Sequence, residues 1–98
     1  MNLIKGLKAV ASARRLRILE VLGSVEIGAT GQRGLSAKEV AKSVGLSQPA
    51  LSEQMQILLN AGLVESRDAG RWVLYTRDEE RIRQLRQTII DQLLPTVR

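Results

Sequence analysis

Cysteine and histidine are both absent from this chain, and their absence excludes several kinds of site. Without cysteine there is no disulfide, no thiolate metal site and no cysteine nucleophile. Without histidine the chain lacks the commonest general base and metal ligand. No phosphate-binding Gly-Lys motif and no converging pair of carboxylates stands out. We therefore expect neither an enzyme nor a bound metal or cofactor.

Aromatic residues and long apolar runs are also scarce. Trp72 and Tyr75 are the only aromatic side chains, so the core must be built from Leu, Ile, Val and Ala, which suits helices. No apolar run approaches the roughly 20 residues that span a bilayer. Residues 1–10 are too short, and too interrupted by Lys5 and Lys8, for a signal peptide. We expect a cytoplasmic protein with no membrane partner.

The length and charge of the chain limit the number of domains that it can form and the kinds of partner that it can bind. With 98 residues it has room for one domain, which would bury only about two-thirds of its unfolded surface. Pairing with a second copy would bury more apolar area. The net charge of +5 favours a polyanionic partner such as nucleic acid or an anionic membrane, although solubility alone also accounts for such a charge.

The first third of the chain is predicted to form two helices and a loop. Apolar residues at helical spacing predict a helix over 2–11. Ser12 is placed to cap a second helix with Leu16, Leu19, Val21 and Leu22 on its apolar face and Gly23 at its exit. Residues 23–34 hold four glycines and predict a flexible loop. We favour a tolerated insertion over a mobile functional loop, because surface loops accept added length at little cost.

The middle of the chain predicts two short helices joined by a tight turn. Ser36 and Glu39 form a capping box that opens a helix over 36–44, and Gly45 allows a left-handed end. Ser47 caps the next helix, over 47–61, and Pro49 is tolerated in its first turn.

A hairpin and a last helix complete the expected fold. The β-rich runs 63–67 and 71–75 surround the turn 68–70. Thr76 and Glu79 form a second capping box, and the last helix is expected to run to Leu94, before Pro95. The expected fold is mainly α with a β-hairpin wing: one winged helix-turn-helix domain over 1–98, with about five helices. Its helix-turn-helix covers 36–61 and its wing 63–76.

The second helix of the pair is expected to enter the major groove of DNA. Its polar residues suit base reading, because Gln bonds adenine, Ser bonds several bases, Glu accepts from cytosine and Ala touches the thymine methyl. The outward residues are Ser47, Gln48, Ala50, Ser52, Glu53, Gln54 and Gln56. An ordinary solvated polar face is the alternative interpretation.

Positive charge must be supplied from outside this helix. Residues 43–66 contain no Lys or Arg, although phosphate contacts provide much of the affinity for DNA. The expected contacts are Lys38 and Lys42 on the preceding helix and Arg67 and Arg71 beside the wing turn; Arg14, Arg15 and Arg17 are further cations.

The helices over 1–11 and 77–94 are expected to form a homodimer. Their apolar stripe is broad for so small a core, although it could also fold back onto its own chain. The expected interface residues are Leu3, Ile4, Leu7, Ile82, Leu85, Ile89 and Leu93. Two-fold symmetry would place two recognition helices about 34 Å apart, so the expected partner is double-stranded DNA carrying an inverted repeat.

Residues 46–75, LSQPALSEQMQILLNAGLVESRDAGRWVLY, closely resemble the helix-turn-helix and wing of the ArsR/SmtB-like bacterial repressors. Residues 13–22, ARRLRILEVL, resemble their second helix, so the resemblance covers nearly the whole chain except 23–34. It implies a homodimeric repressor that occupies an operator and is released by a metal ion or another inducer.

Three departures from that family pattern stand out. Members commonly carry His, Lys or Arg where this chain has Glu53, Gln54 and Gln56. The cysteine motif that many members place on the helix matching 36–44 is absent, and so are the histidines of the last helix. Asp78, Glu79, Glu80 and Asp91 there suit helix-end electrostatics. Any inducer or co-effector, whose identity the sequence leaves unknown, is therefore not sensed through Cys or His.

The sequence thus predicts a sequence-specific transcriptional regulator, a dimeric repressor. A winged-helix protein-interaction module with weak or no DNA binding is the alternative, because the recognition helix carries no positive charge.

Overall fold

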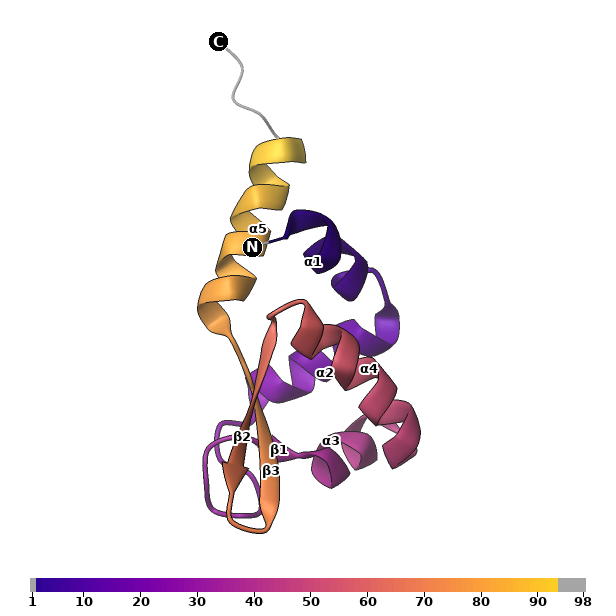
Figure 1. Cartoon of the computed structure of the whole chain (residues 1–98), viewed down its shortest axis with the longest axis vertical. Coiled ribbons are helices and arrows are strands. Elements are labelled where there is room, and N and C mark those ends of the chain that lie inside the picture. The colour runs from indigo at the N-terminus through magenta and orange to yellow at the C-terminus, as the bar shows by residue number, and fades with distance from the viewer. Residues whose placement is uncertain (1, 94–98) are drawn as a thin grey trace.

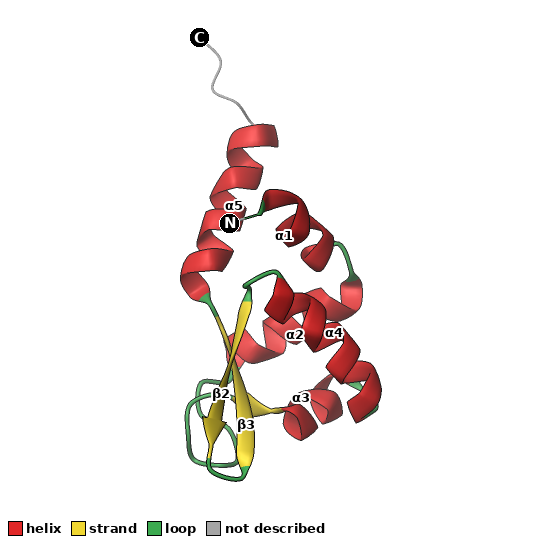
Figure 2. Cartoon of the chain, viewed as in Figure 1, coloured by secondary structure: helices red, strands yellow, loops and turns green. Residues whose placement is uncertain are grey.

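The structure, a computed structural model, describes residues 2–93, in which five helices and three strands follow one another (Figures 1 and 2). The elements are α1 (Leu3–Val10), α2 (Ala13–Ser24), β1 (Leu35–Ser36), α3 (Ala37–Val44), α4 (Gln48–Asn60), β2 (Val64–Ala69), β3 (Trp72–Arg77) and α5 (Glu79–Leu93). The predicted fold class is confirmed. Met1 and the predicted helix end at Leu94 and Pro95 lie outside the described residues.

Three of the predicted helix caps form as expected. Ser12 accepts a hydrogen bond from the backbone of Arg15, and Ser47 accepts one from Ala50. Ser36 and Glu39 make the full reciprocal capping box at the start of α3, whose end at Gly45 has φ +71°. These caps satisfy backbone N–H groups that the first turn of a helix leaves unpaired.

The predicted capping box of Thr76 and Glu79 is wrong. β3 continues through Arg77, which pairs with Val64, so Thr76 belongs to the strand and faces Glu65 in the register. Asp78 takes the capping role instead, and its carboxylate accepts from the backbone of Arg81. The strand pairing across the hairpin therefore delays the start of α5 by two residues.

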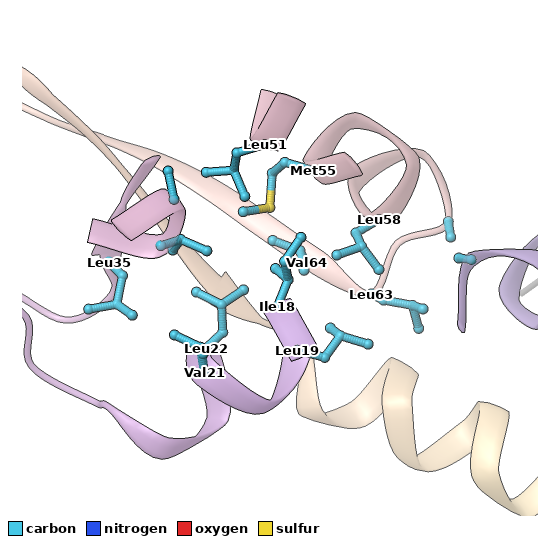
Figure 3. Close-up of a cluster of buried hydrophobic side chains, with 14 of the residues drawn as sticks. Ile18, Leu19, Val21, Leu22, Leu35, Leu51, Met55, Leu58, Leu63 and Val64 are labelled. Carbon is cyan, nitrogen blue, oxygen red and sulfur yellow. The ribbon is translucent and has the colours of Figure 1, made fainter. Parts of the chain in front are cut away.

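The core lies where α2, α3 and α4 meet the sheet (Figure 3). Ile18 of α2, Leu51 and Leu58 of α4 and Leu63 ahead of β2 are fully buried. One prediction needs correction here: Leu16 was expected on the buried face of α2 but is 51% exposed, and Ile18 takes the central place. These contacts fix α4 by its inner face and leave its outer face free.

The wing is a two-stranded hairpin extended to three strands by β1. β2 and β3 pair antiparallel from Val64 and Arg77 to Ala69 and Trp72, a longer ladder than the sequence predicted. Gly70 at the turn has φ +73°, the conformation that a two-residue hairpin turn needs at its first position. β1 pairs with the other edge of β3, which gives the order β1-β3-β2.

The segment before β1, residues 25–34, is an ordered lobe beside the wing (Figure 1). Ile27 forms isolated bridges with Arg33 and Gly34, and Gly34 donates to the carbonyl of Glu26. Ala29 donates to the Glu39 carboxylate of α3 at 2.8 Å. The lobe is thus tied to the helix-turn-helix, which a purely flexible loop would not be.

None of the helices within residues 2–93 is long and apolar enough to cross a membrane.

Candidate nucleic-acid interface

The first half of α4 presents an exposed polar face. Its inner residues Leu51 and Met55 are buried in the core, so the remaining positions of each turn face outward. Among the predicted base-reading residues, those exposed are Ser47, Gln48, Ser52, Glu53 and Gln56, while Ala50 and Gln54 are half-buried. The helix start, with its unpaired N–H groups and partial positive charge, also attracts phosphate.

Gln54 differs from its neighbours because another helix holds its side chain. Its Oε1 accepts a hydrogen bond from Nη1 of Arg15 on α2 at 2.8 Å. Arginine only donates, so this contact fixes the amide with its oxygen toward Arg15 and its nitrogen away. Gln54 is therefore less free to bond both adenine atoms than the sequence suggested.

Lys38 and Lys42 stand one turn apart on the exposed side of α3, close to the wing. With Trp72 of β3 and residues 29–30 they line a hollow of about 330 Å³. The polar floor of this hollow includes Ser36 and Glu39. Exposed lysines suit phosphate groups and an exposed aromatic ring suits base stacking, so Trp72 is a candidate residue of this interface that the sequence did not indicate.

Glu39 at this hollow is held as a carboxylate. Partial burial acts to raise its pKa, but hydrogen bonds from the backbone of Ala29 and from the backbone and hydroxyl of Ser36 together lower the pKa below its ordinary value of 4.5. The carboxylate of Glu39 therefore accepts hydrogen bonds from two backbone N–H groups and a hydroxyl of the protein itself.

The two wing arginines have different surroundings. Arg71 is exposed at the turn, with its guanidinium carbon 4.8 Å from the centre of the Trp72 ring. Arg67 instead folds onto the lobe before β1, donating to the carbonyl of Arg33 at 2.9 Å and to the Gln32 side chain at 3.4 Å. The protein itself therefore uses more of the hydrogen-bonding capacity of Arg67 than of Arg71.

Arg67 also borders a shallow cleft of about 630 Å³ on the wing. Its other lining residues are Arg33, Glu65, Ser66, Thr76 and Arg77. Arg77 already pairs with Glu79 at 2.8 Å and donates to the carbonyl of Leu19. The positive charge of the cleft is thus largely engaged within the protein.

The predicted dimer residues separate into exposed and buried groups. Ile4 is 60% exposed and Leu93 is 72% exposed, while Leu3, Leu7, Ile82 and Ile89 are partly covered. Leu85 departs from expectation, because it is only 4% exposed and already belongs to the core of this chain.

An apolar groove of about 530 Å³ runs between α5 and the first two helices. The residues that line it are Val10, Leu16, Leu19, Glu20, Arg77, Ile82, Leu85, Arg86, Ile89 and Ile90.

Metal-ligating residues do not gather within the part of the chain that the structure describes: over residues 2–93, no three or more carboxylates come together.

Comparison with known proteins agrees with this architecture. Residues 10–67 match the helix-turn-helix domain family. The transcriptional regulator NmtR of Mycobacterium tuberculosis is 33% identical over 79 residues, which are 81% of this chain and 59% of NmtR. The transcriptional activator HlyU of Vibrio cholerae is 35% identical over 79 residues, 81% of this chain and 66% of HlyU. The chain thus spans under two thirds of the length of each relative.

A solved structure shows the same arrangement. The solution structure of the homodimeric winged helix-turn-helix DNA-binding domain Mb0332 from Mycobacterium bovis, described as an ArsR-family candidate, superposes with a TM-score of 0.69 at 29% identity. The match covers 93% of this chain and 80% of that domain. All three relatives are described as regulators of transcription or DNA-binding domains, not as enzymes. With α3, α4 and the wing in the order that this fold requires, the chain belongs to the ArsR family of winged helix-turn-helix transcriptional regulators.

Proposed function

We propose that this protein is a dimeric repressor that binds an inverted-repeat operator in double-stranded DNA. The observation that carries the proposal is the exposed polar face at the start of α4, together with exposed cations on two neighbouring elements, Lys38 and Lys42 on α3 and Arg71 on the wing. In this arrangement α4 reads base edges, while the three cations bind phosphates on either side of the groove. The reading residues are Ser47, Gln48, Ala50, Ser52, Glu53 and Gln56, with Gln54 restricted to donating.

A homodimer is supported by the apolar residues that one chain leaves uncovered. Ile4 and Leu93 are large, apolar and mostly exposed, and the groove beside α5 continues the same surface. The relative from Mycobacterium bovis is described as homodimeric. Burying this surface against a second copy stabilises the pair by about 25 cal/mol per Å² of apolar area.

Repression requires only that the bound dimer occupies the operator. HlyU is described as an activator, and we propose the opposite sign of regulation for this chain, in which the bound dimer blocks transcription. The proposed function agrees with the cytoplasmic location that we expect from the sequence.

One observation favours a second candidate, a protein-interaction module. α4 carries no Lys or Arg, and Glu53 is exposed on the face that would meet phosphate-rich DNA. A protein partner with polar and basic groups would suit that face as well as DNA does.

Salt dependence separates the two candidates. We expect a labelled genomic duplex to be bound by the dimer through about six cations, three from each chain, so that log K falls with log salt at a slope of about −5. Fluorescence anisotropy between 50 and 200 mM salt would then show about a thousandfold loss of affinity. A flat or absent DNA response, together with salt-insensitive capture of a protein, would favour the interaction module.

A further inference from the structure

The guanidinium of Arg15 lies at a junction of three helices. Its Nε donates to the carbonyl of Ala9 at 2.7 Å and its Nη2 to the carbonyl of Lys8 at 3.0 Å, both at the end of α1. Its Nη1 donates to Oε1 of Gln54 on α4 at 2.8 Å. Arg15 itself is in the first turn of α2 and is partly buried. One side chain therefore bonds the end of α1 to the outer half of α4.

The end of α1 is a suitable place for this cation. The last carbonyls of a helix have no partner within the helix and carry a partial negative charge. Arg15 meets two of these carbonyls at once with its fixed planar donors, which a lysine ammonium would not match in geometry. Its contacts with α1 therefore fix the position of the Arg15 guanidinium, and the third donor of that guanidinium in turn fixes the side chain of Gln54.

The Gln54 contact acts at the edge of the buried stripe of α4. Leu51 and Leu58 anchor the inner face of the helix, and Gln54 lies between them at the edge of that face. Ser52 and Glu53, on the outward side of α4, are exposed. Because the same guanidinium is bonded to α1, the hydrogen bond to Gln54 resists displacement of α4 relative to α1.

We infer that Arg15 is a positioning residue that fixes the recognition helix α4 relative to α1, and so sets which half-site spacing the dimer accepts. This inference rests on the proposed function, in which α1 contributes to the dimer contact and α4 reads DNA. If α1 lies at the two-fold axis, a shift of α4 relative to α1 occurs in both protomers and changes the distance between the two recognition helices by twice as much. The hydrogen bonds of Arg15 limit this shift and make the dimer selective for one half-site spacing.

The test measures affinity for an inverted repeat whose half-sites are moved apart or together by one and two base pairs. Arg15→Gln should flatten the spacing profile, so that the preference of the wild type for its best spacing falls by at least about threefold. Affinity for a single half-site should change no more than in Arg14→Gln, which removes the same charge from the neighbouring exposed position. Arg14→Gln itself should keep the wild-type spacing profile.

A second variant tests the same inference if Arg15→Gln is poorly folded. Gln54→Met removes the acceptor on α4 and leaves both Arg15 bonds to α1, so it should flatten the profile in the same way. Combining it with Arg15→Gln should flatten the profile no further. Circular dichroism and urea unfolding confirm that the proteins compared are folded.

Three results would overturn the inference, and they differ in what else they reject. If folded Arg15→Gln and Gln54→Met both keep the wild-type spacing profile, Arg15 has no positioning role and the proposed function stands. If the wild type binds inverted repeats of every spacing alike, the positioning role fails and the proposed function stands. If the wild type binds no inverted repeat, the proposed function fails and the positioning role fails with it.

Discussion

Single residues in this protein take roles that their neighbours in space decide. Arg15 and Gln54 are 39 positions apart, and nothing local in the sequence pairs them. Ser36 and Glu39, by contrast, are three positions apart, and their capping box was predictable because a helix start brings such residues together. Contacts within one turn of a helix can therefore be predicted from sequence here, whereas contacts between helices needed the fold.

The two wing arginines provide the first prediction at this scale. Arg71→Ala should weaken binding to all DNA sequences. It should also make the slope of log K against log salt less steep by about 1 for each chain, since one phosphate contact is lost per chain. Arg67→Ala is the matched control, because it removes the same charge from a side chain that is bonded to the lobe before β1. Anisotropy titrations over a salt series measure both. An unaltered slope in Arg71→Ala would remove it from the DNA contacts.

Glu39 provides a prediction for pH. Its folded pKa lies below the ordinary value of 4.5, so its bonds stabilise the folded state above pH 4.5 and are lost as pH falls through the folded pKa. Glu39→Gln keeps an acceptor at this capping-box position but loses the negative charge near the start of α3, so it should cost about 0.3–1 kcal/mol at neutral pH. It should also lose less stability on acidification than the wild type.

Urea unfolding at neutral and acidic pH measures the effect of Glu39→Gln. Glu53→Gln, at an exposed position outside this network, is the control and should behave as the wild type does. Equal acid sensitivity in the wild type and Glu39→Gln would contradict the role given to Glu39.

At the scale of elements, the helices were predicted better than the sheet. Helix starts and ends are marked by local residues such as Ser47 and Gly45. β1 has only two residues, and it is a strand because Leu35 pairs with Tyr75, forty positions away in sequence. The same non-local pairing extends β3 past Thr76, which is why Asp78 caps α5.

The lobe before β1 gives a prediction that tests its contact with the sheet. Gly34 has φ +104°, and a Cβ there would lie 2.9 Å from the carbonyl oxygen of Tyr75. Gly34→Ala should therefore destabilise the fold by about 1–3 kcal/mol. Gly31→Ala is the control, since its φ is +79° but a Cβ there meets nothing within 4 Å. Urea unfolding compares the two, and equal costs would mean that the lobe does not pack firmly on β3.

At the scale of the whole molecule, the dimer prediction depends on which apolar residues one chain already covers. Ile4→Glu places a charge on a mostly exposed side chain, so we expect a folded monomer in light scattering. Leu85→Ala removes a core side chain instead and should cost about 2–5 kcal/mol of unfolding free energy. An unchanged dimer mass for Ile4→Glu would exclude α1 from the interface.

The sequence could predict that some apolar surface was in excess, since the stripe of the last helix is broad for so small a core. It could not predict that α5 turns Leu85 inward and leaves Leu93 outward, because that depends on how α5 packs against the first two helices. The residues that the sequence predicts for the dimer interface thus separate into core and surface residues only in the folded chain.

Selection of binding sites from random duplex DNA at about physiological salt tests the central claim most directly. The account predicts that the purified dimer enriches an inverted repeat whose half-site centres are about one helical turn, roughly 34 Å, apart. A folded dimer that enriches no motif, or only a single unrepeated one, would contradict it.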